Sequence, residues 1–146
     1  MPKMSINQCT VTLTRKCNLR CNFCYAKKTE YMETANLEYD NLKKIVDFCN
    51  DAKVMFIVFT GGEPTLYPQL IDILQYIKSK EHKMLPTIAT NGIELEDMQY
   101  CKTLIDNGIG YIDISLLAVC VTVPIIKKII YICLVHTKIS FYILQG

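Results

Sequence analysis

Several features that would point to a particular class of protein are missing from this chain of 146 residues. The formal net charge is only +2, which is too small a bias to predict binding to nucleic acid or to a membrane surface. Residues 1–16 alternate between apolar and polar side chains and contain no apolar segment before a cleavage site. We therefore expect no secretory signal peptide and a cytoplasmic protein. No internal repeat or low-complexity tract is visible, and the length fits one domain.

A long uninterrupted apolar run is also absent, although 51% of the residues are hydrophobic. The most apolar segment follows Ser115 and contains no acidic residue, but Pro124 and the pair Lys127-Lys128 interrupt it. A transmembrane helix needs about 20 consecutive apolar residues, so a membrane span is the less favoured alternative to a packed core.

Cysteine, by contrast, is plentiful, with eight residues. A disulfide-rich secreted domain is one interpretation of an even count, but the missing signal peptide and the strong helix and strand patterns argue against it. Closely spaced thiols in a cytoplasmic protein usually bind metals. Only two histidines are present, His82 and His136, and neither lies near the closely spaced cysteines in the sequence.

Strand and helix patterns alternate along the first 115 residues. Runs of apolar and β-branched residues predict strands at 9–14, 54–60, 84–90 and 109–115. Apolar stripes predict helices at 37–50, 66–77 and 98–105, of which Asn36 would cap the first and Asn107-Gly108 would end the third. This alternation predicts an α/β fold built of parallel βαβ units.

Three cysteines, Cys17, Cys21 and Cys24, have the spacing CX3CX2C, with the aromatic Phe23 just before the third. Cysteine thiolates ligate iron–sulfur clusters. Three ligands on one loop leave the fourth iron of a cubane open, and an open position is typical of a catalytic metal site. A zinc site and solvent-exposed thiols remain alternatives.

Further chemistry-bearing residues follow the second strand, in Thr60-Gly61-Gly62-Glu63-Pro64. The two glycines allow a ligand to approach the backbone closely, and the carboxylate of Glu63 could accept hydrogen bonds from a ligand ammonium group. An ordinary turn shaped by Pro64 is the alternative interpretation.

Polar residues also end the third and fourth strands. Thr90 and Asn91 end the third, where a simple polar turn is an equal alternative, and Asp113 and Ser115 share one face of the fourth. In parallel α/β barrels the carboxyl ends of the strands build the active site, so we expect these groups to converge on one ligand.

The sequence TRKCNLRCNFCYA, together with GGEP, resembles the radical S-adenosylmethionine (SAM) superfamily over residues 6–115. The resemblance implies a partial (β/α) barrel, with Cys17, Cys21 and Cys24 holding a [4Fe–4S] cluster. It implies an enzyme that reductively cleaves SAM to a 5′-deoxyadenosyl radical, which abstracts hydrogen from a substrate. The SAM-binding residues that it implies are Phe23, Gly61, Gly62, Glu63, Pro64, Thr90, Asn91 and Ser115.

The family core has more βα units than the four that are legible here. We therefore predict the N-terminal part of the core in residues 1–115 and a divergent or frameshifted apolar tail in 116–146. A truncated, inactive remnant and an iron–sulfur binding module are the alternatives to an active enzyme. The substrate cannot be identified from the sequence, and the resemblance implies an electron donor such as flavodoxin or ferredoxin.

Overall fold

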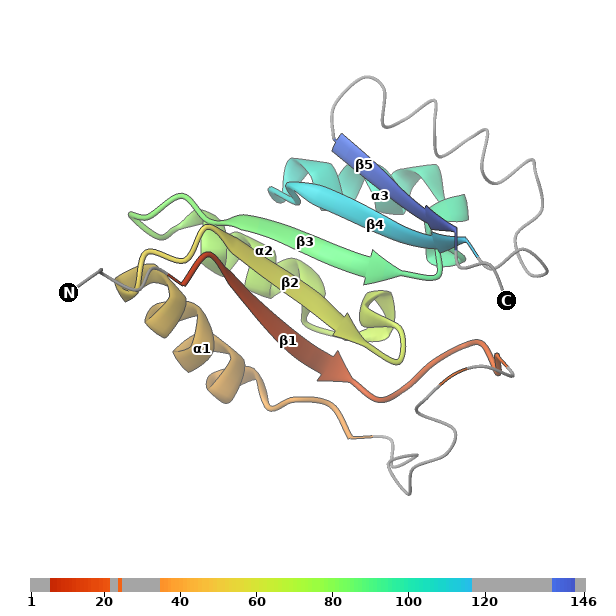
Figure 1. Cartoon of the computed structure of the whole chain (residues 1–146), viewed down its shortest axis with the longest axis horizontal. Helices are drawn as coiled ribbons and strands as arrows, with labels where there is room; N and C mark the ends of the chain where they lie inside the picture. Colours follow the sequence, from red (N-terminus) through yellow and green to blue (C-terminus); the bar gives the residue numbers. More distant parts are fainter. Residues whose placement is uncertain (1–5, 22–23, 25–34, 117–137, 144–146) are drawn as a thin grey trace.

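The computed structural model describes residues 6–21, 24, 35–116 and 138–143, which form one sheet of five parallel strands. The strands are β1 (Gln8–Thr14), β2 (Phe56–Gly61), β3 (Leu85–Thr90), β4 (Tyr111–Leu116) and β5 (Lys138–Ile143). Each strand pairs with the next one along the chain (Figure 1). This sequential order is the winding of a (β/α) barrel, because doubly wound sheets reverse their strand order.

Three helices connect the first four strands and pack on one face of the sheet (Figure 1). They are α1 (Tyr39–Asp51), α2 (Leu70–Lys78) and α3 (Met98–Asp106), and the short 3-10 turns η2 (Pro64–Leu66) and η3 (Glu94–Glu96) precede α2 and α3. Alternate strand residues point toward the helices and are buried with their apolar stripes. The strand side of this core consists of Val11, Leu13, Ile57, Phe59, Ile88, Ile112 and Ile114.

The side chains on the opposite face of the sheet are mostly shorter and more polar than those that face the helices. Near the amino ends of the strands the rings of Phe56 and Tyr111 contact each other, with centroids 6.0 Å apart. Toward the carboxyl ends the exposed or half-buried residues are mostly short. We call this surface the open face, and it consists of Thr10, Thr12, Val58, Thr60, Ala89, Asp113 and Ser115.

The predicted first helix is confirmed, but its cap is not. The helix begins at Tyr39, and its N-cap is Glu38, whose side chain makes no capping hydrogen bond. Asn36 instead forms an antiparallel bridge with Thr14, whose hydroxyl donates to Asn36 Oδ1 at 2.7 Å. The chain runs beside the end of β1 before it turns into the helix, which leaves Asn36 too early to serve as a cap.

Two residues of the predicted apolar stripes lie outside the core. Met98 is the first residue of α3 and is 47% exposed, whereas Cys101 and Leu104 form the buried side of that helix. Leu66 belongs to η2 rather than α2 and is half-buried. The predicted end of the third helix is confirmed, since Asn107 is its C-cap and Gly108 has a φ of +95°.

The tail contributes a strand that the sequence patterns did not predict. Lys138–Ile143 pairs in parallel with β4, in register from Tyr111 opposite Lys138 to Leu116 opposite Ile143, so the edge of β4 is paired. Its β-branched and aromatic sequence, KISFYI, is the signal that could have revealed it. The predicted boundary at residue 115 falls within β4, and residues 117–137 lie outside the described part.

Within the described ranges, no helix is long and apolar enough to cross a membrane. The division into 1–115 and 116–146 stays a prediction. The coding DNA tests it, because a frameshift predicts that another reading frame continues the βα pattern.

Candidate cofactor site

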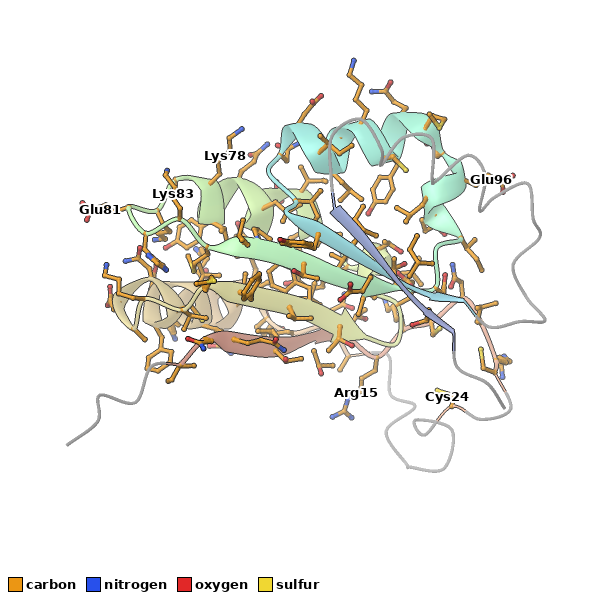
Figure 2. All side chains as sticks on the ribbon, turned by 45° about the horizontal axis from the view of Figure 1, so that its top comes forward. Arg15, Cys24, Lys78, Glu81, Lys83 and Glu96 are labelled. Carbon is orange, nitrogen blue, oxygen red and sulfur yellow. The ribbon has the colours of Figure 1, made fainter. Side chains whose placement is uncertain are left out.

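The predicted site residues that the structure describes lie at the carboxyl edge of the sheet. Figure 2 shows Arg15 and Cys24 at this edge, away from the loop that carries Glu81 and Lys83 at the other end. Phe23, which the resemblance placed beside the cofactor, lies outside the described residues.

Gly61 and Gly62 bring the end of β2 into contact with the end of β1. The Gly62 N–H donates to the carbonyl of Thr14 at 2.8 Å. A Cβ atom on Gly61 would lie 2.2 Å from that same carbonyl oxygen, and one on Gly62 would lie 2.2 Å from the carbonyl oxygen of Lys16. Any larger residue would therefore push away the backbone that leads into the cysteine loop.

Glu63 is buried, with only 1% of its surface exposed, and its carboxylate binds groups of the protein itself. The Thr65 N–H and hydroxyl donate to Oε1 at 3.1 and 2.6 Å, and the Thr90 hydroxyl donates to the same oxygen at 2.6 Å. The Asn91 N–H donates to Oε2 at 2.8 Å. Glu63 thus joins the ends of β2 and β3, while a contact of its carboxylate with a ligand ammonium group stays a prediction.

The end of β3 forms a tight polar turn around this carboxylate. Thr90 is 1% exposed, and its hydroxyl also accepts a hydrogen bond from the Gly92 N–H at 3.1 Å. The Asn91 side chain accepts from the Ile93 N–H at 3.0 Å and donates from Nδ2 to the Asn18 side chain at 2.7 Å. Pro64 is buried at the start of η2, in the turn that follows Glu63.

Asn18 is the residue of this edge that the sequence patterns did not single out. It follows Cys17 directly, accepts from Asn91 through Oδ1 and donates through Nδ2 to Glu94 Oε1 at 3.2 Å. Its position beside a cysteine was the only available signal, because its partners lie more than 70 residues away along the chain.

The three cysteines of the motif form no disulfide; Cys17 is exposed, and Cys21 and Cys24 are half-buried. The Leu19 N–H donates to Cys17 Sγ at 3.4 Å, and the Cys24 N–H donates to the Cys21 carbonyl at 3.2 Å. Among the residues that the structure describes, no three His, Cys, Asp or Glu side chains are close enough to hold a metal ion.

Three reduced sulfurs on one loop nevertheless fit an iron–sulfur cluster in their donor chemistry. The cluster itself would have to draw them together. Arg15, Lys16 and Arg20 are exposed around this loop, and positive charge there favours the thiolate form of cysteine.

Burial perturbs two ionisable groups near the site. Burial, together with the negative charges of Glu63 and Glu94, raises the pKa of Tyr100 to about 12, and its hydroxyl lies 3.4 Å from the carbonyl oxygen of Thr65. Burial also raises the pKa of Asp113 on the open face. Ser115 lies half-buried on the same face of β4, as the period of a strand predicted.

The remaining described cysteines are not candidate ligands. Cys49 on α1 and Cys101 on α3 are buried in the core between the helices and the sheet. Burial and the neighbouring thiol of Cys9 raise the pKa of Cys49 to about 12.

Comparison with known proteins identifies the family of this chain. The sequence profile described as "Radical SAM superfamily" matches residues 11–130, which is most of the chain and extends past residue 115. The chain therefore belongs to the radical SAM superfamily, as its motifs implied. A [4Fe–4S] cluster and SAM are the cofactors of this family.

Two curated relatives show the range within the family. A "Probable GTP 3′,8-cyclase" of Methanococcus maripaludis is 34% identical over 106 residues, covering 73% of this chain and 35% of that protein. An "Fe-coproporphyrin III synthase" of Methanosarcina barkeri is 34% identical over 104 residues, covering 71% of this chain and 25% of that protein. The chain thus spans between a quarter and about a third of these relatives.

A solved structure confirms the predicted fold class. BtrN, crystallised in complex with AdoMet and 2-DOIA, superposes with a TM-score of 0.77 at 20% sequence identity. The match covers 97% of this chain and 58% of that one. The partial (β/α) barrel is therefore confirmed, with β5 added to the predicted units.

Proposed function

We propose that this chain carries the cofactor site of a radical SAM enzyme, in which Cys17, Cys21 and Cys24 ligate three irons of a [4Fe–4S] cluster. One observation supports this most. The cysteine loop is hydrogen-bonded to both other motifs of the edge, through the Glu63 N–H to the Lys16 carbonyl at 2.7 Å and through Asn91 to Asn18 at 2.7 Å. Three motifs that are separate in the sequence therefore lie together at the carboxyl ends of β1, β2 and β3.

The roles of the residues follow from this arrangement. The thiolates would hold the cluster and leave one iron open for the amino and carboxylate groups of SAM. Gly61 and Gly62 would present their backbone to the methionine end of SAM, with Pro64, Thr90 and Asn91 fixing the surrounding turns, as the rigid positioning of a reactive cofactor requires. Ser115 would contact its ribose or carboxylate from β4, and Phe23 would lie beside the adenine.

When bound, the reduced cluster would supply the electron for cleavage of SAM, and SAM would supply the 5′-deoxyadenosyl group for hydrogen abstraction from a substrate, with Cys17, Cys21 and Cys24 holding the cluster in place. The open face, with its short side chains near the carboxyl ends, would leave room for that substrate. The relatives carry the names of different reactions, so they support a shared cofactor chemistry and not one substrate.

An external electron donor such as flavodoxin or ferredoxin would reduce the cluster. A reducing compartment such as the cytoplasm would keep the three motif cysteines in the reduced form that cluster binding needs.

The experiment is anaerobic reconstitution of the full chain with iron and sulfide, followed by reduction with dithionite in the presence of SAM. We expect about four irons per chain, absorbance typical of a [4Fe–4S] cluster, and 5′-deoxyadenosine detected by mass spectrometry. Cys17→Ser should abolish both signals, and Cys9→Ser, a half-buried cysteine on β1, should leave them unchanged.

A chain that binds no cluster would contradict the proposal. A stable cluster without any 5′-deoxyadenosine would instead support an iron–sulfur binding module or an inactive remnant, and it would contradict the catalytic part.

A further inference from the structure

The side chain of Asn18 lies between two groups of the β3 end, and nothing in the family motifs gives it a role. We propose that Asn18 is a positioning residue: its amide fixes the cysteine loop to the turn after β3 and thereby holds Cys17 in place as a cluster ligand. The proposal rests on the proposed function, since it assumes that Cys17 binds the cluster.

Both the oxygen and the nitrogen of the Asn18 side-chain amide form hydrogen bonds, and only one orientation of the amide allows both. Its Oδ1 accepts from Asn91 Nδ2 at 2.7 Å, and its Nδ2 donates to Glu94 Oε1 at 3.2 Å. A carboxylate accepts hydrogen bonds but cannot donate them, so the Nδ2 atom must face Glu94. The Asn18 side chain therefore has a defined rotamer although it is exposed.

Asn91 is itself held rigidly, which makes it a firm anchor. Its N–H donates to Glu63 at 2.8 Å, and its side-chain Oδ1 accepts from the Ile93 N–H at 3.0 Å. With the oxygen engaged in this way, Nδ2 is directed at the loop. A continuous chain of hydrogen bonds thus runs from the buried carboxylate of Glu63 through Asn91 to Asn18.

Cys17 is held by attachments on both sides. The residue before it, Lys16, accepts from the Glu63 N–H at 2.7 Å, and the residue after it is Asn18. These two anchors restrict the backbone of Cys17 before any metal binds, which lowers the entropy that cluster binding must remove. Mutation of a group that orients a metal ligand without itself binding the metal typically lowers metal affinity by about 10- to 100-fold.

The first test compares Asn18→Ala with Asn41→Ala, which removes an exposed asparagine of α1 whose side chain accepts a hydrogen bond from Lys44 on the same helix. Both variants and the wild type are reconstituted anaerobically, and loss of the cluster absorbance to an iron chelator is followed over time. We expect Asn18→Ala to lose its cluster about 10-fold faster than the wild type, as an orienting group does. Asn41→Ala should match the wild type.

A rescue experiment separates positioning from a general loss of structure. Asn18→Asp keeps an oxygen toward Asn91 but places a carboxylate against that of Glu94, so we expect rapid cluster loss. Adding Glu94→Gln supplies a donor to the new carboxylate and should restore the wild-type rate, whereas Glu94→Gln alone should change little. A loop that merely tolerates any polar side chain would not show this reciprocal pattern.

The outcomes distinguish this inference from the proposed function. If the wild type forms no cluster, the proposed function fails, and this inference fails with it. If the wild type forms a stable cluster and Asn18→Ala loses it at the same rate, only the positioning role is refuted. Equal acceleration in Asn18→Ala and Asn41→Ala, or no rescue in the double variant, refutes it as well.

Discussion

Replacing Glu63 by glutamine changes one atom of a buried group that four protein donors contact. The glutamine carbonyl can take the place of Oε1 and still accept from Thr65 and Thr90. The amide NH2 then faces the N–H of Asn91, and two donors cannot bond to each other. The substitution therefore leaves one partly buried backbone N–H without an acceptor and replaces a charged acceptor by a neutral one for the other three donors.

The magnitude follows from these contacts. An unsatisfied buried donor costs about 1–3 kcal/mol, and a hydrogen bond to a neutral acceptor is weaker than one to a charged acceptor by roughly 1 kcal/mol. One unsatisfied donor and three weakened hydrogen bonds together make about 4 kcal/mol at the low end, so we expect Glu63→Gln to lower the free energy of unfolding by about 4 kcal/mol. Glu63→Ala should lower it by more, because alanine leaves all four donors without that acceptor. Domain stabilities are about 5–15 kcal/mol, so this loss is a large share.

The assay is urea unfolding followed by far-UV circular dichroism, with Glu96→Gln as the matched control. The control makes the same chemical change at Glu96, an exposed glutamate that Figure 2 shows on the outer side of the molecule. Substitutions at such positions usually change stability by less than about 0.5 kcal/mol. If Glu63→Gln stays within that range of the control, or is more stable than the wild type, the reasoning about the buried carboxylate is wrong.

Three further predictions concern other parts of the described structure. Gly62→Ala should destabilise the fold by more than Gly108→Ala, measured by urea unfolding, and equal losses would contradict this. The new Cβ at Gly62 meets a backbone carbonyl at 2.2 Å, whereas the one at Gly108 meets a lysine side chain at 3.7 Å and costs only the strain of a φ of +95°, about 1–2 kcal/mol. Burial raises the pKa of Asp113 in the folded state above its ordinary value of 3.8. Between 3.8 and the raised pKa, the folded state keeps a proton that the unfolded state has lost, so the free energy of unfolding falls as pH rises through this range. Asp113→Asn should therefore be more stable than the wild type at pH 7, a difference that disappears below about pH 3.8 in unfolding experiments; a constant difference would refute the assignment. Burial raises the pKa of Cys49 and leaves its side chain inaccessible, whereas Cys17 is exposed. Peptide mapping after alkylation of the metal-free native chain should therefore find Cys17 modified and Cys49 protected; comparable labelling would count against it.

Much of the fold could be predicted because its signals are local. The run that predicted a strand at 54–60 forms β2, with Ile57 and Phe59 facing the helices. The strand begins two residues later than predicted because pairing starts where Gln8 lies opposite Phe56. Residues Lys138–Ile143 were missed because they pair with β4 across a long segment and no turn signals precede them.

The residues of the candidate site were predictable as types, but their contacts were not. The spacing of the cysteines and the GGEP sequence indicated the chemistry. The sequence indicated that Glu63 accepts hydrogen bonds, but it could not show that Thr90 and Asn91, 27 and 28 residues away, are among the donors. Asn18 carried no signal beyond its place beside Cys17, since its side-chain partners are 73 and 76 residues away.

The sequence by itself determined the class of this protein and the set of thiols that we propose as cluster ligands. Such a ligand set depends on residue types a few positions apart. Covalent connectivity keeps those residues close together in any conformation of the chain. Only the tertiary structure decided which polar groups already have partners and how the cysteine loop is attached to the sheet. Those facts depend on hydrogen bonds of about 3 Å between strand ends, and the parallel order of β1, β2 and β3 is what brings the strand ends together.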